Sequence, residues 1–139
     1  MSPEERIAQT EARRAARKAD LEKQRVEQYS LDLAALDTAE EEHGDARIAR
    51  LDLDYTPGLP TIVVVKCPSR DHIKVYRAKV SEKKPDHTKA AVWLAGRCLV
   101  YPSPEVFEQL IDAYPGIDAQ AGLRASLLSV AKAQDEGEG

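Results

Sequence analysis

The residues best suited to chemistry in this sequence are two cysteines and two histidines. Cys67 and His72 are five positions apart, and His87 and Cys98 follow downstream. Thiolate and imidazole groups are the usual ligands of a structural zinc ion, so four such side chains could form a site. The chain lacks closely spaced C-x-x-C or H-x-x-H pairs, however, and Cys98 lies in an apolar run. We therefore expect both cysteines to pack as small apolar side chains, with no metal site and no cofactor.

A catalytic pair or triad is not indicated either. Three histidines and two cysteines will contain some thiol–imidazole combination by chance. No local motif indicates that any such pair is catalytic. The many carboxylates lie mostly in the charged N-terminal segment or in the expected first turns of helices, where they are solvated or interact with the helix dipole. Acid–base catalysis would require two carboxylates in an apolar pocket, and no stretch provides them. We therefore expect a protein that is not an enzyme.

A phosphate-binding loop would place glycines between a strand and a helix. The apolar stretch TIVVVKC (61–67) is followed directly by PSRD, which contains no glycine. A single phosphate held at that helix start by Lys66 and Arg70 is the remaining alternative, and no motif specifies it.

The charge pattern argues against nucleic-acid binding. The chain carries a formal net charge of −4, whereas binding to nucleic acid requires a positive field that displaces counterions. Basic residues gather in RRAARK (13–18) and in a looser run over residues 74–89, but acidic residues lie close to both. We interpret both runs as solvated faces.

Length and composition predict one modest domain with an appendage. The 139 residues include one Trp, one Phe and five Tyr, so the core must be small and built mostly from Val, Leu, Ile and Ala. No stretch approaches the roughly 18 apolar residues that span a bilayer, and the N-terminus has no apolar run typical of a secretory signal. Two distant cysteines do not indicate a disulfide framework. We expect a cytoplasmic protein with reduced thiols and no membrane contact.

The sequence of residues 1–42 predicts one long, charged helical arm. This segment contains no Gly, and its only Pro is Pro3, which follows the capping residue Ser2 and precedes the acidic Glu5. A narrow apolar seam with heptad spacing runs along it and is broken at Glu22: Ala8, Ala12, Ala15, Ala19, Val26, Tyr29, Leu33 and Leu36. Such a seam is typical of a coiled coil or of a helix that docks on a partner.

Alanine buries little area, so the second half of the seam should hold a partner better than the first. The residues that we assign to self-association are therefore Val26, Tyr29, Leu33 and Leu36. Few favourable charge pairs support the arm as an isolated helix, and its helicity should depend on a partner surface.

The remaining chain divides into three segments. Residues 43–59 form a linker, because glycine and prolines interrupt regular structure. A short strand with Leu51, Leu53 and Tyr55 alternating is the other interpretation of its first part. Residues 60–133 form a small α-rich domain, and residues 134–139 form a disordered acidic tail.

Within residues 60–133 the sequence predicts one strand followed by three or four short helices. TIVVVKC is β-branched and bounded by proline, as expected of a strand. Residues 69–80 are predicted to form a helix capped by Ser69. The alternative is a hairpin with the preceding strand. Asp86 is expected to cap a helix that contains a nearly continuous apolar run, residues 90–95. Ser103 and Pro104 begin a further helix that Pro115 and Gly116 end.

The last predicted helix has an apolar face at helical spacing, Leu123, Leu127, Leu128 and Ala131. The fold class is therefore mostly α with a small β element: a long N-terminal helix followed by a compact domain of one strand and several helices.

Two stretches resemble small tail-assembly chaperones encoded in phages and prophages. They are PTIVVVKCPSRDHIKVYRAKV and AGRCLVYPSPEVFEQLIDAYPGI, followed by a Leu-rich last helix, so that the resemblance covers roughly residues 60–131. It implies a non-enzymatic role: binding a long helical tape-measure protein and keeping it soluble until tail-tube subunits polymerise around it.

The resemblance implies protein partners, namely tape-measure and tail-tube proteins. Excess apolar helix faces would cover exposed apolar stripes on such a partner. The residues expected to contact it are Trp93, Tyr101, Phe107, Leu110, Ile111 and Tyr114. Two alternatives remain: a structural component of a particle that uses the arm as a tether, and a coiled-coil adaptor.

Overall fold

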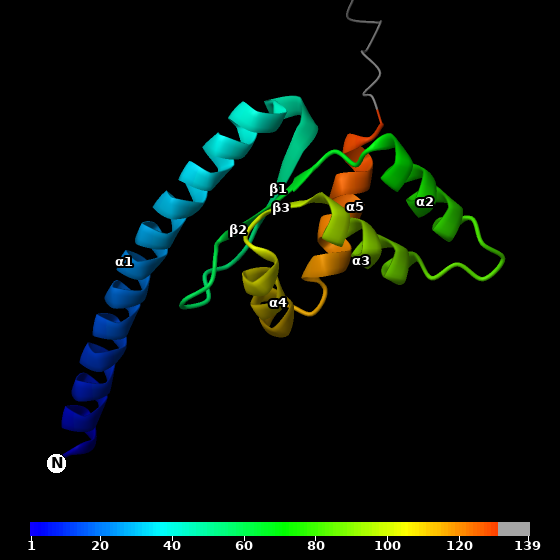
Figure 1. Ribbon diagram of the computed structural model, residues 1–139. Helices are drawn as coiled ribbons and strands as arrows, with labels where there is room; N and C mark the ends of the chain where they lie inside the picture. Colours follow the sequence, from blue (N-terminus) through cyan, green and yellow to red (C-terminus); the bar gives the residue numbers. More distant parts are fainter. Residues whose placement is uncertain (131–139) are drawn as a thin grey trace, which may run out of the picture.

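A three-stranded antiparallel sheet forms the middle layer of the computed structural model, which describes residues 1–130 (Figure 1). The strand order is β1 (Ile48–Asp52), β2 (Ile62–Lys66) and β3 (Leu99–Tyr101). β1 pairs with β2 over the register from Ile48↔Lys66 to Asp52↔Ile62. The strand predicted at 61–67 is thus confirmed as the central strand, and the fold is mostly α with a small β element.

Helix α1 (Pro3–His43) is 41 residues long and covers one face of the sheet with its last third only. The hydroxyl of Ser2 accepts a hydrogen bond from the Glu5 amide, as the sequence predicts, and Gly44 ends the helix with a positive φ of 85°. The buried residues of α1 are Asp32, Leu36 and Ala39. Leu36 and Ala39 pack with Ile62 and Val64 of β2.

Four helices cover the opposite face of the sheet. They are α2 (Arg70–Val80), α3 (His87–Cys98), α4 (Pro104–Ala113) and α5 (Ile117–Leu128). Ser69, Asp86 and Ser103 cap the first three through hydrogen bonds to the amides of His72, Lys89 and Val106, which confirms the predicted starts. The hairpin alternative for residues 69–80 is wrong.

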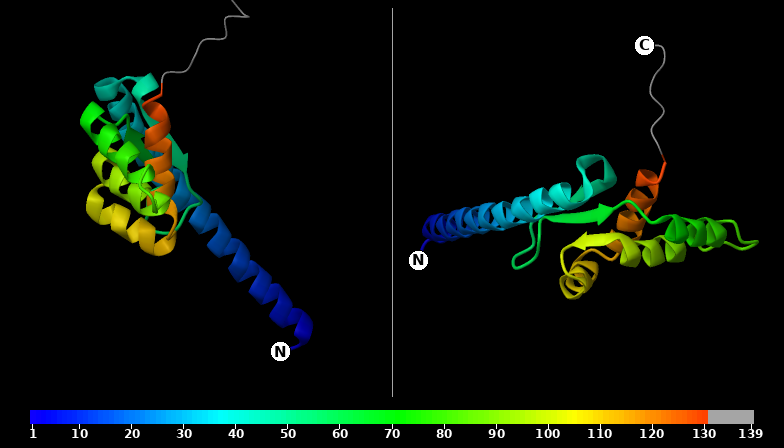
Figure 2. Two further views of the ribbon diagram at one scale, coloured as in Figure 1. Left: turned by 90° about the vertical axis from the view of Figure 1, so that its right-hand side faces the viewer. Right: turned by 45° about the horizontal axis from the view of Figure 1, so that its top comes forward.

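The two faces of β2 belong to two separate apolar clusters. Val63 and Val65 pack with residues of α2 to α5, while Ile62 and Val64 pack with α1. All four valine and isoleucine side chains are therefore fully buried. Figure 2 shows the resulting three layers, with α1 on one side of the sheet and α2 to α5 on the other.

Helices α3 and α5 cross at very close range. A Cβ atom placed on Gly122 would lie 1.8 Å from the carbonyl oxygen of Ala91. Small buried residues line this crossing: Ala90, Ala91 and Ala95 on α3 and Ala121 and Ala125 on α5. The close approach lets the backbones themselves form part of the core.

The predicted linker is largely structured. Residues 43–59 contain a short 3₁₀ helix (Asp45–Arg47) and β1, whose whole length pairs with β2. The alternative strand interpretation is therefore nearer to the structure, although the strand ends at Asp52, before Leu53 and Tyr55. β3 is a further strand that periodicity did not reveal, because its three residues are too few to show alternation.

The last predicted helix is present as α5, but its buried side is not the apolar face that the sequence shows. Leu123 and Leu127 are 51% and 68% exposed, whereas the buried side consists of Ile117, Ala121, Gly122 and Ala125. The close crossing with α3 selects small residues for the buried side. Ala131 and the predicted acidic tail, residues 134–139, lie outside the described residues.

Candidate functional site

The N-terminal half of α1 projects away from the rest of the molecule. Every residue from Pro3 to Lys23 is exposed, and both figures show this part of the helix extending past the sheet and helices α2 to α5 (Figures 1 and 2). We call residues 3–23 the free arm. The side chains that it carries are available to a partner over the entire circumference of the helix.

An apolar strip runs along the free arm and continues onto the docked part of α1. At 100° per residue its members fall within about 60° of one another on the helix circumference. We call it the arm strip; it consists of Ala8, Ala12, Ala15, Ala19, Val26 and Leu33. Val26 and Leu33 are 52% and 39% exposed. The strip therefore lies beside the face that packs on the sheet, and it remains uncovered.

The other two residues assigned to self-association have different surroundings. Leu36 packs in the cluster under β2, and Tyr29 is partly buried at the edge of that contact. The heptad seam is offset from the docked face, since the buried positions are 32, 36 and 39. The structure thus divides the predicted seam: Val26 and Leu33 stay on the surface, and Leu36 serves the domain core.

Asp32 fixes α1 on the sheet. It is fully buried and accepts hydrogen bonds from the Thr61 amide at 2.7 Å and from the Gln28 side chain at 2.9 Å. The hydroxyls of Thr61 and Tyr101 donate to the same carboxylate. Burial, assisted by the bond to Asp32, holds the pKa of Tyr101 far above its usual range. Four donors from three segments of the chain therefore bond to the Asp32 carboxylate. The sequence pattern did not identify Asp32 as a buried residue.

The six residues expected to contact a partner do not form one surface. Phe107 and Leu110 are buried in the core against the sheet, and Tyr101 donates to Asp32. The Tyr114 hydroxyl lies 2.7 Å from Thr56 Oγ1 and donates to the Asp54 carbonyl at 2.9 Å. Ile111 is partly buried beside these residues. Most of this set serves packing in the folded chain.

Trp93 lies half-buried on α3 within a group of basic side chains. The His72 ring meets it edge-on, with 5.8 Å between centroids. The Lys79 ammonium and the Arg97 guanidinium lie 5.6 Å and 5.1 Å from its ring centroid, within cation–π range. Of the six expected partner contacts, Trp93 is the one that adjoins a charged surface.

Helix α5 presents a second exposed apolar strip. Leu123 and Leu127 are one helical turn apart, and Val130, 60% exposed, continues the line just past the helix. We call these three residues the α5 strip. Leu123 and Leu127 belong to the apolar face that the sequence shows at helical spacing, and the structure leaves both exposed.

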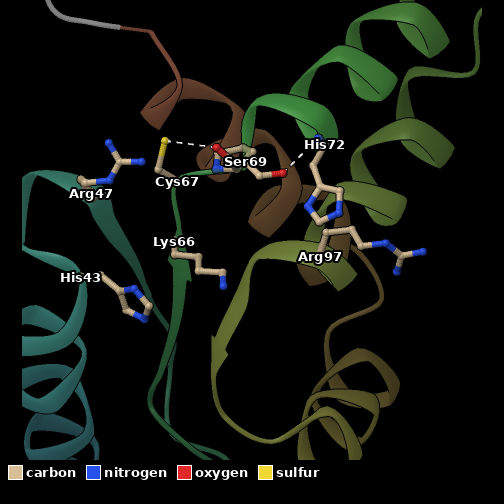
Figure 3. A pocket seen from close by; sticks show the side chains of 8 residues that line it. His43, Arg47, Lys66, Cys67, Ser69, His72 and Arg97 are labelled. Carbon is tan, nitrogen blue, oxygen red and sulfur yellow. Dashed lines mark hydrogen bonds between the residues drawn. The ribbon is translucent and has the colours of Figure 1, made fainter.

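A basic pocket opens where the sheet, α1 and α2 meet (Figure 3). It has a volume of about 200 Å³. Its lining comes from the end of α1, the 3₁₀ helix, β2, the start of α2 and α3: His43, Arg47, Lys66, Cys67, Pro68, Ser69, His72 and Arg97. No acidic residue is among them, so the pocket is suited to an anion.

The two cysteines differ in their surroundings. Cys67 is partly exposed in the basic pocket, and its thiol donates to the Leu128 carbonyl at 3.4 Å. Cys98 is fully buried, and this burial raises the pKa of its thiol to about 11. Within residues 1–130, no three His, Cys, Asp or Glu side chains are grouped closely enough to hold a metal ion.

The raised pKa of Cys98 predicts a loss of stability at alkaline pH. A thiol of the unfolded chain ionises near pH 9, but the buried one stays protonated to about pH 11. The contribution is therefore complete below pH 9 and disappears as pH rises toward 11, by about 2 kcal/mol at pH 10.5. Urea unfolding at pH 8 and pH 10.5 should show a smaller decline for Cys98→Ala than for the native chain. Equal declines would contradict the assignment.

No family model matches the chain, and neither a curated protein nor a solved structure is significantly similar to it. Among the described residues, no helix is both long and apolar enough to cross a membrane.

Proposed function

We propose that this chain is a non-enzymatic assembly protein that binds an elongated helical partner through the arm strip. The tail-assembly chaperone role implied by the sequence resemblance is the specific form of this proposal. In that role the chain would act in the cytoplasm, would shield apolar surface of a tape-measure protein, and would be displaced by tail-tube subunits.

The observation that carries the proposal is the exposed strip on an uncovered helix. From Ala8 to Leu33 the strip extends for about 38 Å, at 1.5 Å per residue. A free helix of this composition gains most of its stability from packing rather than from propensity. Pairing the strip with a second helix would supply that packing, and its small alanines would let the two backbones approach closely.

The α5 strip supports the shielding role. Leu123 and Leu127 expose apolar area on the side of the domain that carries α2 to α5, whereas the arm strip belongs to the layer formed by α1. Two narrow apolar surfaces on different layers suit reversible binding, because neither is large enough for an obligate interface. A chaperone that must be displaced needs such modest contacts.

Charge placed on the arm strip should abolish partner binding. Val26→Glu combined with Leu33→Glu replaces both large members of the strip, each worth about 1.5 to 3 kcal/mol when buried. We expect at least a 100-fold loss of affinity for a co-expressed tape-measure fragment. Co-purification on a tagged fragment and the soluble yield of that fragment are the measurements.

Leu31→Glu provides the matched control. Leu31 lies on the same helix and is 66% exposed, but it lies about 140° from the centre of the arm strip. It should leave binding and fragment solubility unchanged. Equal losses for the control and the double variant, or no association of the native chain with any tape-measure fragment, would contradict the proposal.

The free arm also favours a second candidate, a particle component that uses residues 3–23 as a tether between subunits. Deleting residues 1–23 leaves the contacts of Asp32, Leu36 and Ala39 in place, whereas deleting residues 1–42 would uncover one face of β2. If the arm joins copies of this chain, the shorter deletion should convert an oligomer into monomers in light scattering. Recovery of the chain from purified mature particles would favour the tether over the chaperone.

A further inference from the structure

The basic pocket takes part of its lining from a basic segment of an otherwise acidic chain. Nine basic and three acidic residues lie between positions 66 and 97, a net +6 in a chain whose total is −4. Three of the pocket's cationic side chains are Arg47, Lys66 and Arg97. Within residues 1–130, no carboxylate forms an ion pair with any of them. Among the described residues, the nearest acid to the lining is Glu42, whose carboxylate lies 3.8 Å from His43 Nε2, so these three cations keep their charge unpaired.

Side chains from separate elements line this one pocket. Figure 3 shows His43 beside β2 on the side of α1, Lys66 on β2 itself, and Ser69 and His72 at the start of α2. Lys66 comes from the end of β2 and His43 from the end of α1, 23 positions earlier in the chain. The position of each is fixed by paired or packed backbone, so the arrangement does not depend on a loose loop.

The start of α2 adds a further positive contribution. The first amides of a helix have no acceptor within it, and the helix dipole is positive at this end. The Ser69 hydroxyl caps the His72 amide at 3.1 Å, which leaves the preceding amides of the turn for another acceptor. Asp71 opposes this field from the first turn but is exposed and does not line the pocket.

Arg97 has a different role from Lys66. Its guanidinium stacks on Trp93 at 5.1 Å, and in Figure 3 it points away from Lys66. Arg97 therefore lines the pocket with its guanidinium directed away from Lys66, whereas Lys66, Arg47 and His43 line it from β2, the 3₁₀ helix and α1.

We propose that the basic pocket binds a phosphate group, either as the free ion or as the end of a small phosphorylated molecule. A volume of about 200 Å³ is the space of six or seven waters at about 30 Å³ each, enough for a phosphate and a few attached atoms. Tetrahedral oxyanions are held in proteins by Lys and Arg together with helix N-terminal amides. This site is independent of the arm strip and of the proposed assembly role.

The test uses the full chain titrated with inorganic phosphate and, separately, with glycerol 2-phosphate, at constant ionic strength in chloride. Amide chemical shifts followed by NMR should move saturably at residues 66–72 with both probes. Saturation with phosphate alone would assign the site to the free ion, and tighter binding of the ester would assign it to a small phosphorylated molecule.

Lys66→Gln and Arg47→Gln should each weaken binding about tenfold, the factor expected for one charge-assisted hydrogen bond. Lys79→Gln is the matched control: it removes a charge that lies over Trp93, as Arg97 does, but Lys79 does not line the pocket. It should change the affinity less than twofold. Thermal unfolding of each variant, followed by circular dichroism, confirms that it is folded.

Two outcomes would overturn the proposal. The first is the absence of saturable shifts with either probe. The second is an equal loss for the pocket variants and the Lys79→Gln control, because only a diffuse basic surface would treat the three positions alike.

Discussion

Gly122→Ala should prevent stable folding of the domain, or cost at least about 3 kcal/mol of the free energy of unfolding. The added methyl would lie 1.8 Å from the Ala91 carbonyl oxygen and 2.5 Å from its carbonyl carbon. Both are backbone atoms in the middle of α3, so no side-chain rotation can relieve the overlap. The two helices would have to separate, and separation would open the packing around Leu94 and Ala125.

Gly96→Ala is the control for this substitution. Gly96 also lies in α3, but nothing is within 4 Å of a Cβ atom placed on it. Alanine there removes the conformational freedom of glycine from the unfolded chain and should stabilise the protein by about 0.5 to 1 kcal/mol. Urea unfolding of the two variants should therefore shift in opposite directions. A Gly122→Ala midpoint equal to that of the native chain would show that α3 and α5 do not approach this closely.

Asp32→Ala should destabilise the protein by about 3 to 5 kcal/mol and release α1 from the sheet. The substitution leaves the Thr61 amide, the Thr61 hydroxyl and the Tyr101 hydroxyl without their acceptor in a buried place. A buried donor without an acceptor costs about 1 to 3 kcal/mol, and the methyl group fills only part of the vacated space.

Hydrogen exchange can separate the two consequences of Asp32→Ala. Amides of α1 near Leu36 should lose protection, while those around Leu94 on the other side of the sheet should keep more of theirs. Asp37→Ala serves as the comparison, because Asp37 is an exposed aspartate on the same helix. It should change stability by less than about 0.5 kcal/mol. Similar effects at both positions would mean that the buried network does not hold α1.

The helix starts were predictable from sequence because capping is local. Ser2, Ser69, Asp86 and Ser103 each bond to an amide three residues later, so the whole interaction lies within one turn. β2 was predictable for a similar reason. Five consecutive β-branched or apolar residues between prolines suit a strand that is covered on both faces.

The features that depend on distant parts of the chain were not predictable. Asp32 looks like one more acid on a charged helix until Thr61 and Tyr101 are placed beside it, 29 and 69 positions away. The sequence alone does not show why position 122 is glycine, whereas the close approach to Ala91 explains it. The exposed side of α5 was not predictable for the same reason, since a short-range pattern does not show which side the neighbouring helix occupies.

The candidate site was predictable only in part. Val26 and Leu33 were identified from spacing alone, and the structure leaves both on the surface. The basic pocket combines positions 43 to 97 from five elements, and without the fold only the possibility of a phosphate at Lys66 was visible. Distances in space between such residues follow from the sheet register and helix packing, which no local motif encodes.

The contacts of Asp32 also set an order of events during translation. The carboxylate leaves the ribosome 29 residues before Thr61 and 69 residues before Tyr101. Although α1 is synthesised first, its docking can be completed only after nearly the whole sheet has been made. The nascent chain therefore carries an undocked helix, with Leu36 and Ala39 uncovered, until Tyr101 has been added.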